Sequence, residues 1–155
     1  PYTTLFRSKA TGWKDKAEID ERINDVLSDV EMQDKGDRFP HELSGGEQQR
    51  IAIARAILNH PKVIIADEPT GNLDIETARL IIALLRQITQ SGTAVVMTTH
   101  NTSLLNEFPG IVYRCINQQL EDITQDYNTM SLYEEEEEQS ANKGVDYSAR
   151  EDLSI

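Results

Sequence analysis

The spacing of apolar residues in the first third of the chain predicts two helices. From Lys16 to Glu31 apolar positions recur every three or four residues between charged ones, which is typical of an amphipathic surface helix. Ser44 followed three residues later by Glu47 is the capping-box pattern that opens a helix. We expect this second helix to run to about Asn59, just before a proline.

The next stretch predicts a strand, a helix and a second strand. Val63 to Ala66 is a short apolar run rich in β-branched residues, as expected for a parallel strand buried on both faces. Asp74 is suited to the N-cap of a helix that has one apolar side and ends near Gly92. Residues 93–98 then predict the second strand, so the three elements form a βαβ unit.

The last part of the pattern predicts a short helix from about Thr102, a turn at Pro109 and Gly110, and a strand over 111–116. The single cysteine, Cys115, lies in this apolar run, and we expect a buried and inert thiol. Apolar residues become sparse beyond Leu120, so we expect residues 124–155 to form an acidic, disordered tail.

Charge is concentrated at the C-terminal end. The formal net charge is -12, and residues 121–155 contain 11 acidic and 2 basic residues. The rest of the chain is close to neutral and lacks the clustered Lys and Arg that bind nucleic acid, so no nucleic-acid partner is expected. Because no apolar stretch approaches the ~20 residues that span a bilayer, we expect a cytoplasmic protein that meets the membrane only through a partner.

The first eight residues, PYTTLFRS, are what the end of a common sequencing adapter would encode. We therefore expect residues 1–8 to be an assembly artefact and the natural chain to be cut off just before Lys9. The organisation that follows is part of a helical subdomain over 9–60, a sheet-containing core over 61–123 and the tail over 124–155.

Two local patterns carry chemistry. Gly45 and Gly46 follow Ser44 at a helix start, which leaves backbone N–H groups in the positive field of the helix and forms a cradle for an anion. The alternative is purely structural, since a capped helix after two glycines needs no ligand. Asp67 and Glu68 end a strand, where open α/β sheets bind their ligands; the alternative is that they merely begin a turn.

In full, LSGGEQQR, IIADEPTGNLD and the strand that ends at His100 resemble the signature, Walker B, D-loop and switch histidine of ABC-type ATPases. The resemblance implies an α/β, partial P-loop NTPase fold with a parallel-sheet core, its N-terminal portion missing, and ATP and Mg²⁺ as cofactors. It implies that Asp67 helps hold Mg²⁺, that Glu68 orients or deprotonates the attacking water, and that His100 contacts the γ-phosphate.

The same resemblance implies a dimer of two ATPase subunits. Asp74 would reach the opposite subunit, and the signature residues would close on ATP held by that subunit: Ser44, Gly45, Gly46 and Glu47. The printed sequence has no G-x-x-x-x-G-K-[ST] loop, so we expect this chain alone neither to bind ATP tightly nor to hydrolyse it.

Within the ABC ATPases the motifs are most similar to the FtsE family of cell division. That similarity implies an integral membrane partner resembling FtsX and a peripheral location on the inner face of the plasma membrane. Lipoprotein-release or export ATPases of the LolD and MacB type share GNLD and remain an alternative. DNA-associated ATPases of the SMC or repair type, or a non-catalytic interaction module, are alternatives of another class.

Overall fold

The computed structural model describes residues 12–13, 15–101, 103–108 and 110–126. The chain divides into two compact units, Pro1–His100 and Asn101–Ile155. The predicted artefact at 1–8 lies outside the described residues, as does the tail beyond residue 126; residues 124–126 are helical.

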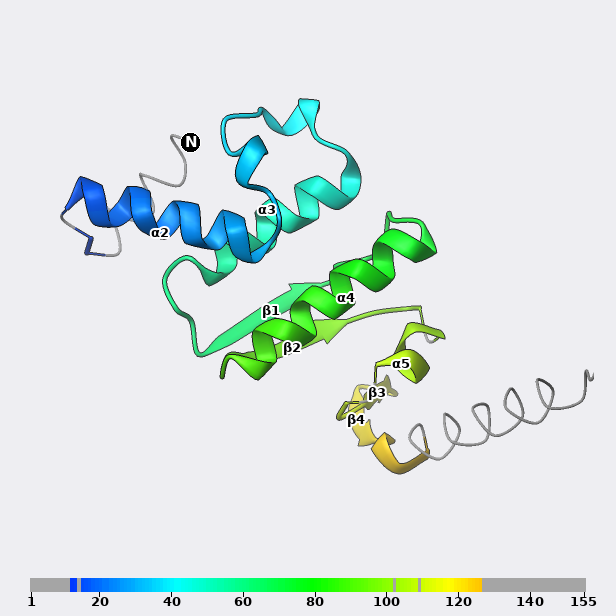
Figure 1. The fold of residues 1–155 in the computed structure, drawn as a ribbon. Coiled ribbons are helices and arrows are strands. Elements are labelled where there is room, and N and C mark those ends of the chain that lie inside the picture. Colours follow the sequence, from blue (N-terminus) through cyan, green and yellow to red (C-terminus); the bar gives the residue numbers. More distant parts are fainter. Residues whose placement is uncertain (1–11, 14, 102, 109, 127–155) are drawn as a thin grey trace, which may run out of the picture. The chain divides into compact units, whose positions relative to one another are not determined.

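Two helices lie side by side at the start of the first unit (Figure 1). Helix α2 covers Lys16–Asp29, and helix α3 covers Gly45–Ile57. Short 3₁₀ turns, η1 at Gln33–Lys35 and η2 at Pro40–Glu42, connect them. The Arg22 guanidinium of α2 donates to the carbonyl oxygens of Ile57 and Leu58 at 2.9 and 3.0 Å, so it gives the end of α3 a charged donor; the Ile57 carbonyl also accepts from the His60 N–H at 3.1 Å. Both predicted helices are confirmed.

The βαβ unit is also confirmed. Strands β1 (Val63–Asp67) and β2 (Ala94–Thr98) pair in parallel, in register from Val63↔Ala94 to Asp67↔Thr98. Helix α4 (Ile75–Gln90) connects them and packs on one face of the sheet (Figure 1). Its apolar side supplies much of the core: Ala78, Ile81, Ile82, Leu84, Leu85 and Ile88.

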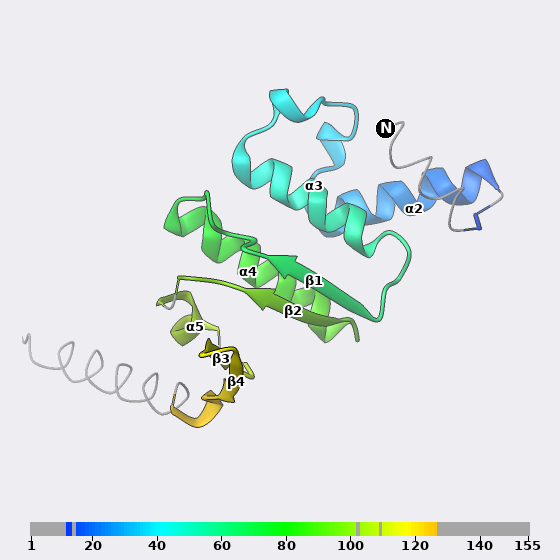
Figure 2. The same ribbon diagram turned by 180° about the vertical axis from the view of Figure 1, so that it is seen from behind.

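The expectation that the first strand is buried on both faces is wrong. Ile64 points toward the helix side and is 7% exposed, whereas its neighbour Ile65 is 82% exposed. Val63 and Val96 on the same open face are also exposed. The physical reason is that, among the described elements, only α4 covers this sheet, and Figure 2 shows the sheet from the side that α4 leaves open.

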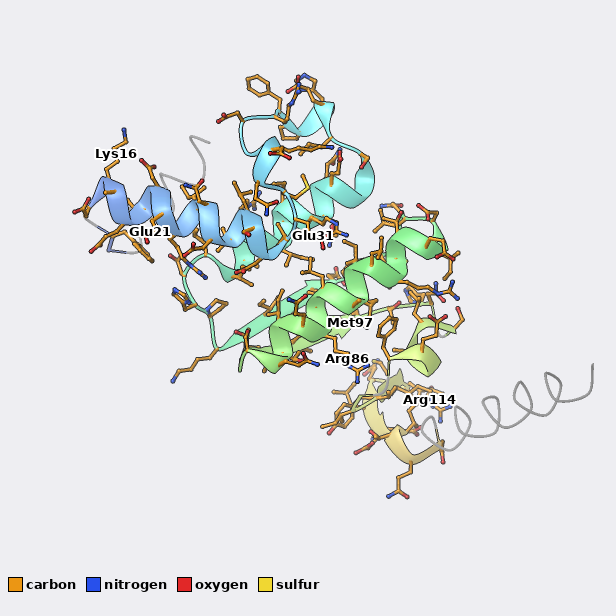
Figure 3. All side chains as sticks on the ribbon, viewed as in Figure 1. Lys16, Glu21, Glu31, Arg86, Met97 and Arg114 are labelled. Atoms are coloured by element: carbon orange, nitrogen blue, oxygen red, sulfur yellow. The ribbon has the colours of Figure 1, made fainter. Side chains whose placement is uncertain are left out.

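The second unit contains helix α5 (Ser103–Glu107) and a hairpin of strands β3 (Tyr113–Ile116) and β4 (Gln119–Asp122). Strand β4 was not predicted. The hairpin is closed by the two-residue turn Asn117–Gln118, whose φ angles of 48° and 63° are those of a type I′ turn. Arg114 pairs with Glu121 across the hairpin at 2.8 Å, and Figure 3 labels Arg114.

The prediction of a buried cysteine is also wrong. Cys115 is a free, exposed thiol. It lies in β3, and every residue of β3 and β4 is exposed, so the apolar run makes a hairpin surface and not a core strand.

Candidate functional site

The carboxyl ends of β1 and β2 bring four polar side chains together, and we call this group the strand-end cluster: Asp67, Glu68, Thr98 and His100. Asp67 and Thr98 are directly opposite each other in the parallel register. The Thr98 hydroxyl donates to Asp67 Oδ1 at 2.6 Å and accepts from the Glu68 backbone N–H at 3.1 Å. His100 Nε2 lies 3.3 Å from Glu68 Oε1. The structure therefore places the three predicted Walker B and switch residues in one group.

Glu68 adopts an uncommon backbone conformation. Its φ is 45°, in the left-handed region that costs a residue with a side chain roughly 1–3 kcal/mol. The Gly71 N–H donates to the Glu68 carbonyl at 3.1 Å, so the turn after the strand holds this conformation. The Glu68 side chain is 33% exposed and that of His100 is 98% exposed, so both can be reached from solvent.

A second group of predicted site residues lies at the start of α3. Ser44 Oγ accepts from the Glu47 backbone N–H at 3.4 Å, and Glu47 Oε2 accepts from the Ser44 backbone N–H at 2.9 Å. Lys35, in η1, forms an ion pair with the other Glu47 carboxylate oxygen. This hydrogen bond with Lys35 is the largest cause that lowers the pKa of Glu47, and the Ser44 backbone adds to it. The capping box is confirmed, and Glu47 is held ionised beside the helix start.

The predicted D-loop aspartate caps α4. Asp74 Oδ1 accepts from the Thr77 backbone N–H at 2.9 Å, and Oδ2 accepts from the Thr77 hydroxyl at 2.6 Å. Both hydrogen bonds lower the pKa of Asp74, and the bond from the Thr77 hydroxyl has the larger effect. The carboxylate therefore stabilises the helix start as an anion.

The starts of α3 and α4 are in close contact at the two signature glycines. A Cβ added to Gly46 would lie 2.5 Å from Thr77 Cγ2, and one added to Gly45 would lie 3.2 Å from Leu73 Cδ2. Only glycine allows this approach without displacing a neighbour. The local sequence pattern did not reveal Lys35, Thr77 or Thr98 as members of the site. The hydroxyl of Thr98 two positions before His100 was the available signal for that residue.

The strand-end cluster contains a carboxylate that could help hold a metal ion together with phosphate groups. Among the residues that the structure describes, no group of three or more His, Cys, Asp or Glu side chains forms a metal cage. Mg²⁺ in phosphoryl-transfer sites is usually bound by one or two carboxylates and by the phosphates of the substrate. The exposed carboxylate of Asp67 matches that donor set.

Comparison with known proteins places these motifs in a family. The family described as ABC transporter matches residues 2–71. The cell division ATP-binding protein FtsE of Streptococcus pneumoniae is 53% identical over 93 residues, which are 60% of this chain and 40% of FtsE. The methionine import ATP-binding protein MetN of Salmonella enteritidis is 48% identical over 101 residues, 64% of this chain and 32% of MetN. The chain thus spans well under half the length of these relatives.

Solved structures agree. The dimeric bacterial ABC transporter cassette MJ0796 superposes with a TM-score of 0.52 at 39% identity, over 60% of this chain and 41% of the cassette. Among the described residues, no helix combines the length and the apolar character needed to cross a membrane. The signature at the start of α3, the strand-end cluster and these relatives together lead to one assignment: the chain carries part of the ATP-binding domain of the ABC transporter family, with its α/β P-loop NTPase fold.

Proposed function

We propose that this chain is part of the ATP-hydrolysing subunit of a membrane complex similar to the FtsE complexes of cell division. The observation that carries the proposal is the strand-end cluster. Glu68 directly follows Asp67, the last residue of β1, and Glu68 Oε1 lies 3.3 Å from His100 Nε2. A carboxylate and an imidazole that are both open to solvent can act on a water molecule and on a phosphate brought to the sheet edge.

Each residue of the cluster has a distinct task in this proposal. Glu68 orients the attacking water or takes its proton, and its carboxylate is accessible enough to do so. His100 donates a hydrogen bond to the terminal phosphate. Asp67 would hold Mg²⁺ together with the phosphates, and the bound ion would neutralise negative charge on them.

The start of α3 serves a second copy of the subunit. The backbone N–H groups of Gly45 and Gly46 and the Ser44 hydroxyl can donate to the phosphates of a nucleotide held by that copy. Glu47 fixes the helix start, and Asp74 at the start of α4 faces the same partner. The dimeric cassette MJ0796 supports a homodimer.

We propose that the membrane partner resembles FtsX and that the subunit is peripheral on the inner face of the plasma membrane, since FtsE is 53% identical. A second candidate is a methionine-import subunit, because MetN is 48% identical over a slightly longer stretch. Depletion of the gene in its host separates the two. Defective division with normal methionine uptake supports the first candidate, and the reverse result supports the second.

ATP turnover is the direct test. A longer protein in which a phosphate-binding loop precedes this chain should hydrolyse Mg-ATP, and the 155-residue chain alone should not. Glu68→Gln in the longer protein should abolish turnover and trap ATP-bound dimers. Glu21→Gln, which changes an exposed carboxylate on α2 (Figure 3), is the matched control and should retain turnover. Undiminished hydrolysis in Glu68→Gln would contradict the role given to Glu68.

A further inference from the structure

We propose that Thr98 is a positioning residue of the strand-end cluster, whose hydroxyl sets both the orientation of the Asp67 carboxylate and the backbone conformation of Glu68. The inference rests on the proposed function for its catalytic meaning. The geometric evidence is two hydrogen bonds made by Thr98 Oγ1, which donates to Asp67 Oδ1 at 2.6 Å and accepts from the Glu68 N–H at 3.1 Å.

The direction of both bonds follows from the groups involved. A threonine hydroxyl has one proton to donate and lone pairs to accept with, whereas a backbone N–H can only donate. The Glu68 N–H therefore donates to Thr98 Oγ1, and the hydroxyl proton is directed to Asp67 Oδ1. One hydroxyl thus connects the side chain of the first carboxylate to the backbone of the second.

The register makes this connection possible. Asp67 and Thr98 are the last paired residues of β1 and β2, and in a parallel ladder paired side chains point to the same face. Glu68 follows directly after the last residue of β1, and its backbone N–H donates to the Thr98 hydroxyl at 3.1 Å.

The backbone of Glu68 depends on this acceptor. Its left-handed φ of 45° persists because it is held on both sides, by Thr98 at the N–H and by the Gly71 N–H at the carbonyl. That conformation brings the Glu68 carboxylate to 3.3 Å from His100 Nε2. Without the hydroxyl, the Glu68 peptide can rotate and the carboxylate leaves this position.

Thr98 is exposed, so its replacement is a mild change for the core. Thr98→Val keeps the β-branched shape that suits a strand and removes only the hydroxyl. Thr98→Ser keeps the hydroxyl. Thr93→Val is the matched control, since the Thr93 hydroxyl donates to the Pro61 carbonyl at 3.0 Å, at the other end of β2.

The geometry is tested by NMR on the ¹⁵N-labelled 155-residue chain. In Thr98→Val the Glu68 amide proton should shift upfield and exchange with solvent about 10-fold faster or more, as for an amide that loses its acceptor. Thr98→Ser and Thr93→Val should leave both quantities at the wild-type values. A Glu68 amide with unchanged shift and exchange in Thr98→Val overturns the proposal.

The catalytic consequence is tested in the longer protein described above. Thr98→Val should lower kcat about 10- to 100-fold with little change in KM for ATP, because it displaces the reacting group and not the nucleotide, and Thr98→Ser should restore kcat. Wild-type kcat in Thr98→Val overturns the positioning role and leaves the proposed function intact. A wild-type protein with no turnover refutes the proposed function, while the NMR measurement still decides the role of Thr98.

Discussion

The contact between Gly46 and Thr77 yields the sharpest prediction on stability. In Gly46→Ala the new methyl carbon would lie 2.5 Å from Thr77 Cγ2 and 3.9 Å from its Cβ. Thr77 cannot turn away freely, because its hydroxyl donates to Asp74 Oδ2 at 2.6 Å. The substitution must therefore separate the starts of α3 and α4 or break the hydrogen bond at the cap of α4.

Two opposing effects set the size of the change. Overpacking a well-packed contact costs about 1–3 kcal/mol. Replacing glycine by alanine within a helix gains up to ~1 kcal/mol. Because a 2.5 Å approach is far inside van der Waals contact, the steric cost should lie near the upper end of its range, and Gly46→Ala should lower the free energy of unfolding by about 1–2 kcal/mol.

Urea unfolding of the 155-residue chain, followed by circular dichroism, measures this change. With a slope of about 2 kcal/mol per M, the midpoint should fall by about 0.5–1 M without a change of slope. Thr77→Ser removes Cγ2 and keeps the hydroxyl bond to Asp74, so the Gly46→Ala/Thr77→Ser double variant should recover most of the loss. Gly45→Ala, with its wider 3.2 Å approach to Leu73 Cδ2, should cost less.

Two results would contradict the prediction for Gly46→Ala. A Gly46→Ala midpoint at or above the wild-type value would mean that helix propensity outweighs the contact and that the two helix starts are not tightly packed. A double variant no more stable than Gly46→Ala would show that the loss does not arise from Thr77 Cγ2.

Three further predictions concern the same unit. Asp74→Ala should lower stability at neutral pH, because hydrogen bonds to Thr77 lower the pKa of Asp74 in the folded state. The stability that Asp74 contributes is therefore present above its unfolded-state pKa and is lost as the pH falls through its folded-state pKa. Asp74→Asn caps the helix without titrating, so urea midpoints measured across pH should lack this acid-dependent loss. Arg22→Met should lower the free energy of unfolding by about 1–3 kcal/mol, since two carbonyls at the end of α3 lose a charged donor, and an unchanged urea midpoint would contradict this role. Ile65→Ala should change the free energy of unfolding by less than about 1 kcal/mol because the Ile65 side chain is exposed. Ile81→Ala in the core should cost about 2–5 kcal/mol. Equal losses for the two variants in thermal melts would show that the open sheet face is covered in solution.

The sequence determined the elements whose causes are local. The spacing of Ser44 and Glu47 and the position of Asp74 before an apolar helical pattern predicted two caps, because the groups that bond in a cap lie within one helical turn. The strand, helix and strand pattern likewise predicted the parallel pair of β1 and β2. The LSGGEQQR signature, together with the motifs around Asp67, predicted the family.

Tertiary structure alone decided the contacts between distant residues. Thr98 binds partners 30 and 31 residues away, and only the strand register places its hydroxyl between them. Burial was decided in the same way: the alternation in β1 marks two faces, but the position of α4 determines that Ile64 is covered and Ile65 is open. Hydrophobic pattern specifies which residues can be buried, and burial itself requires a second surface that the local sequence does not contain.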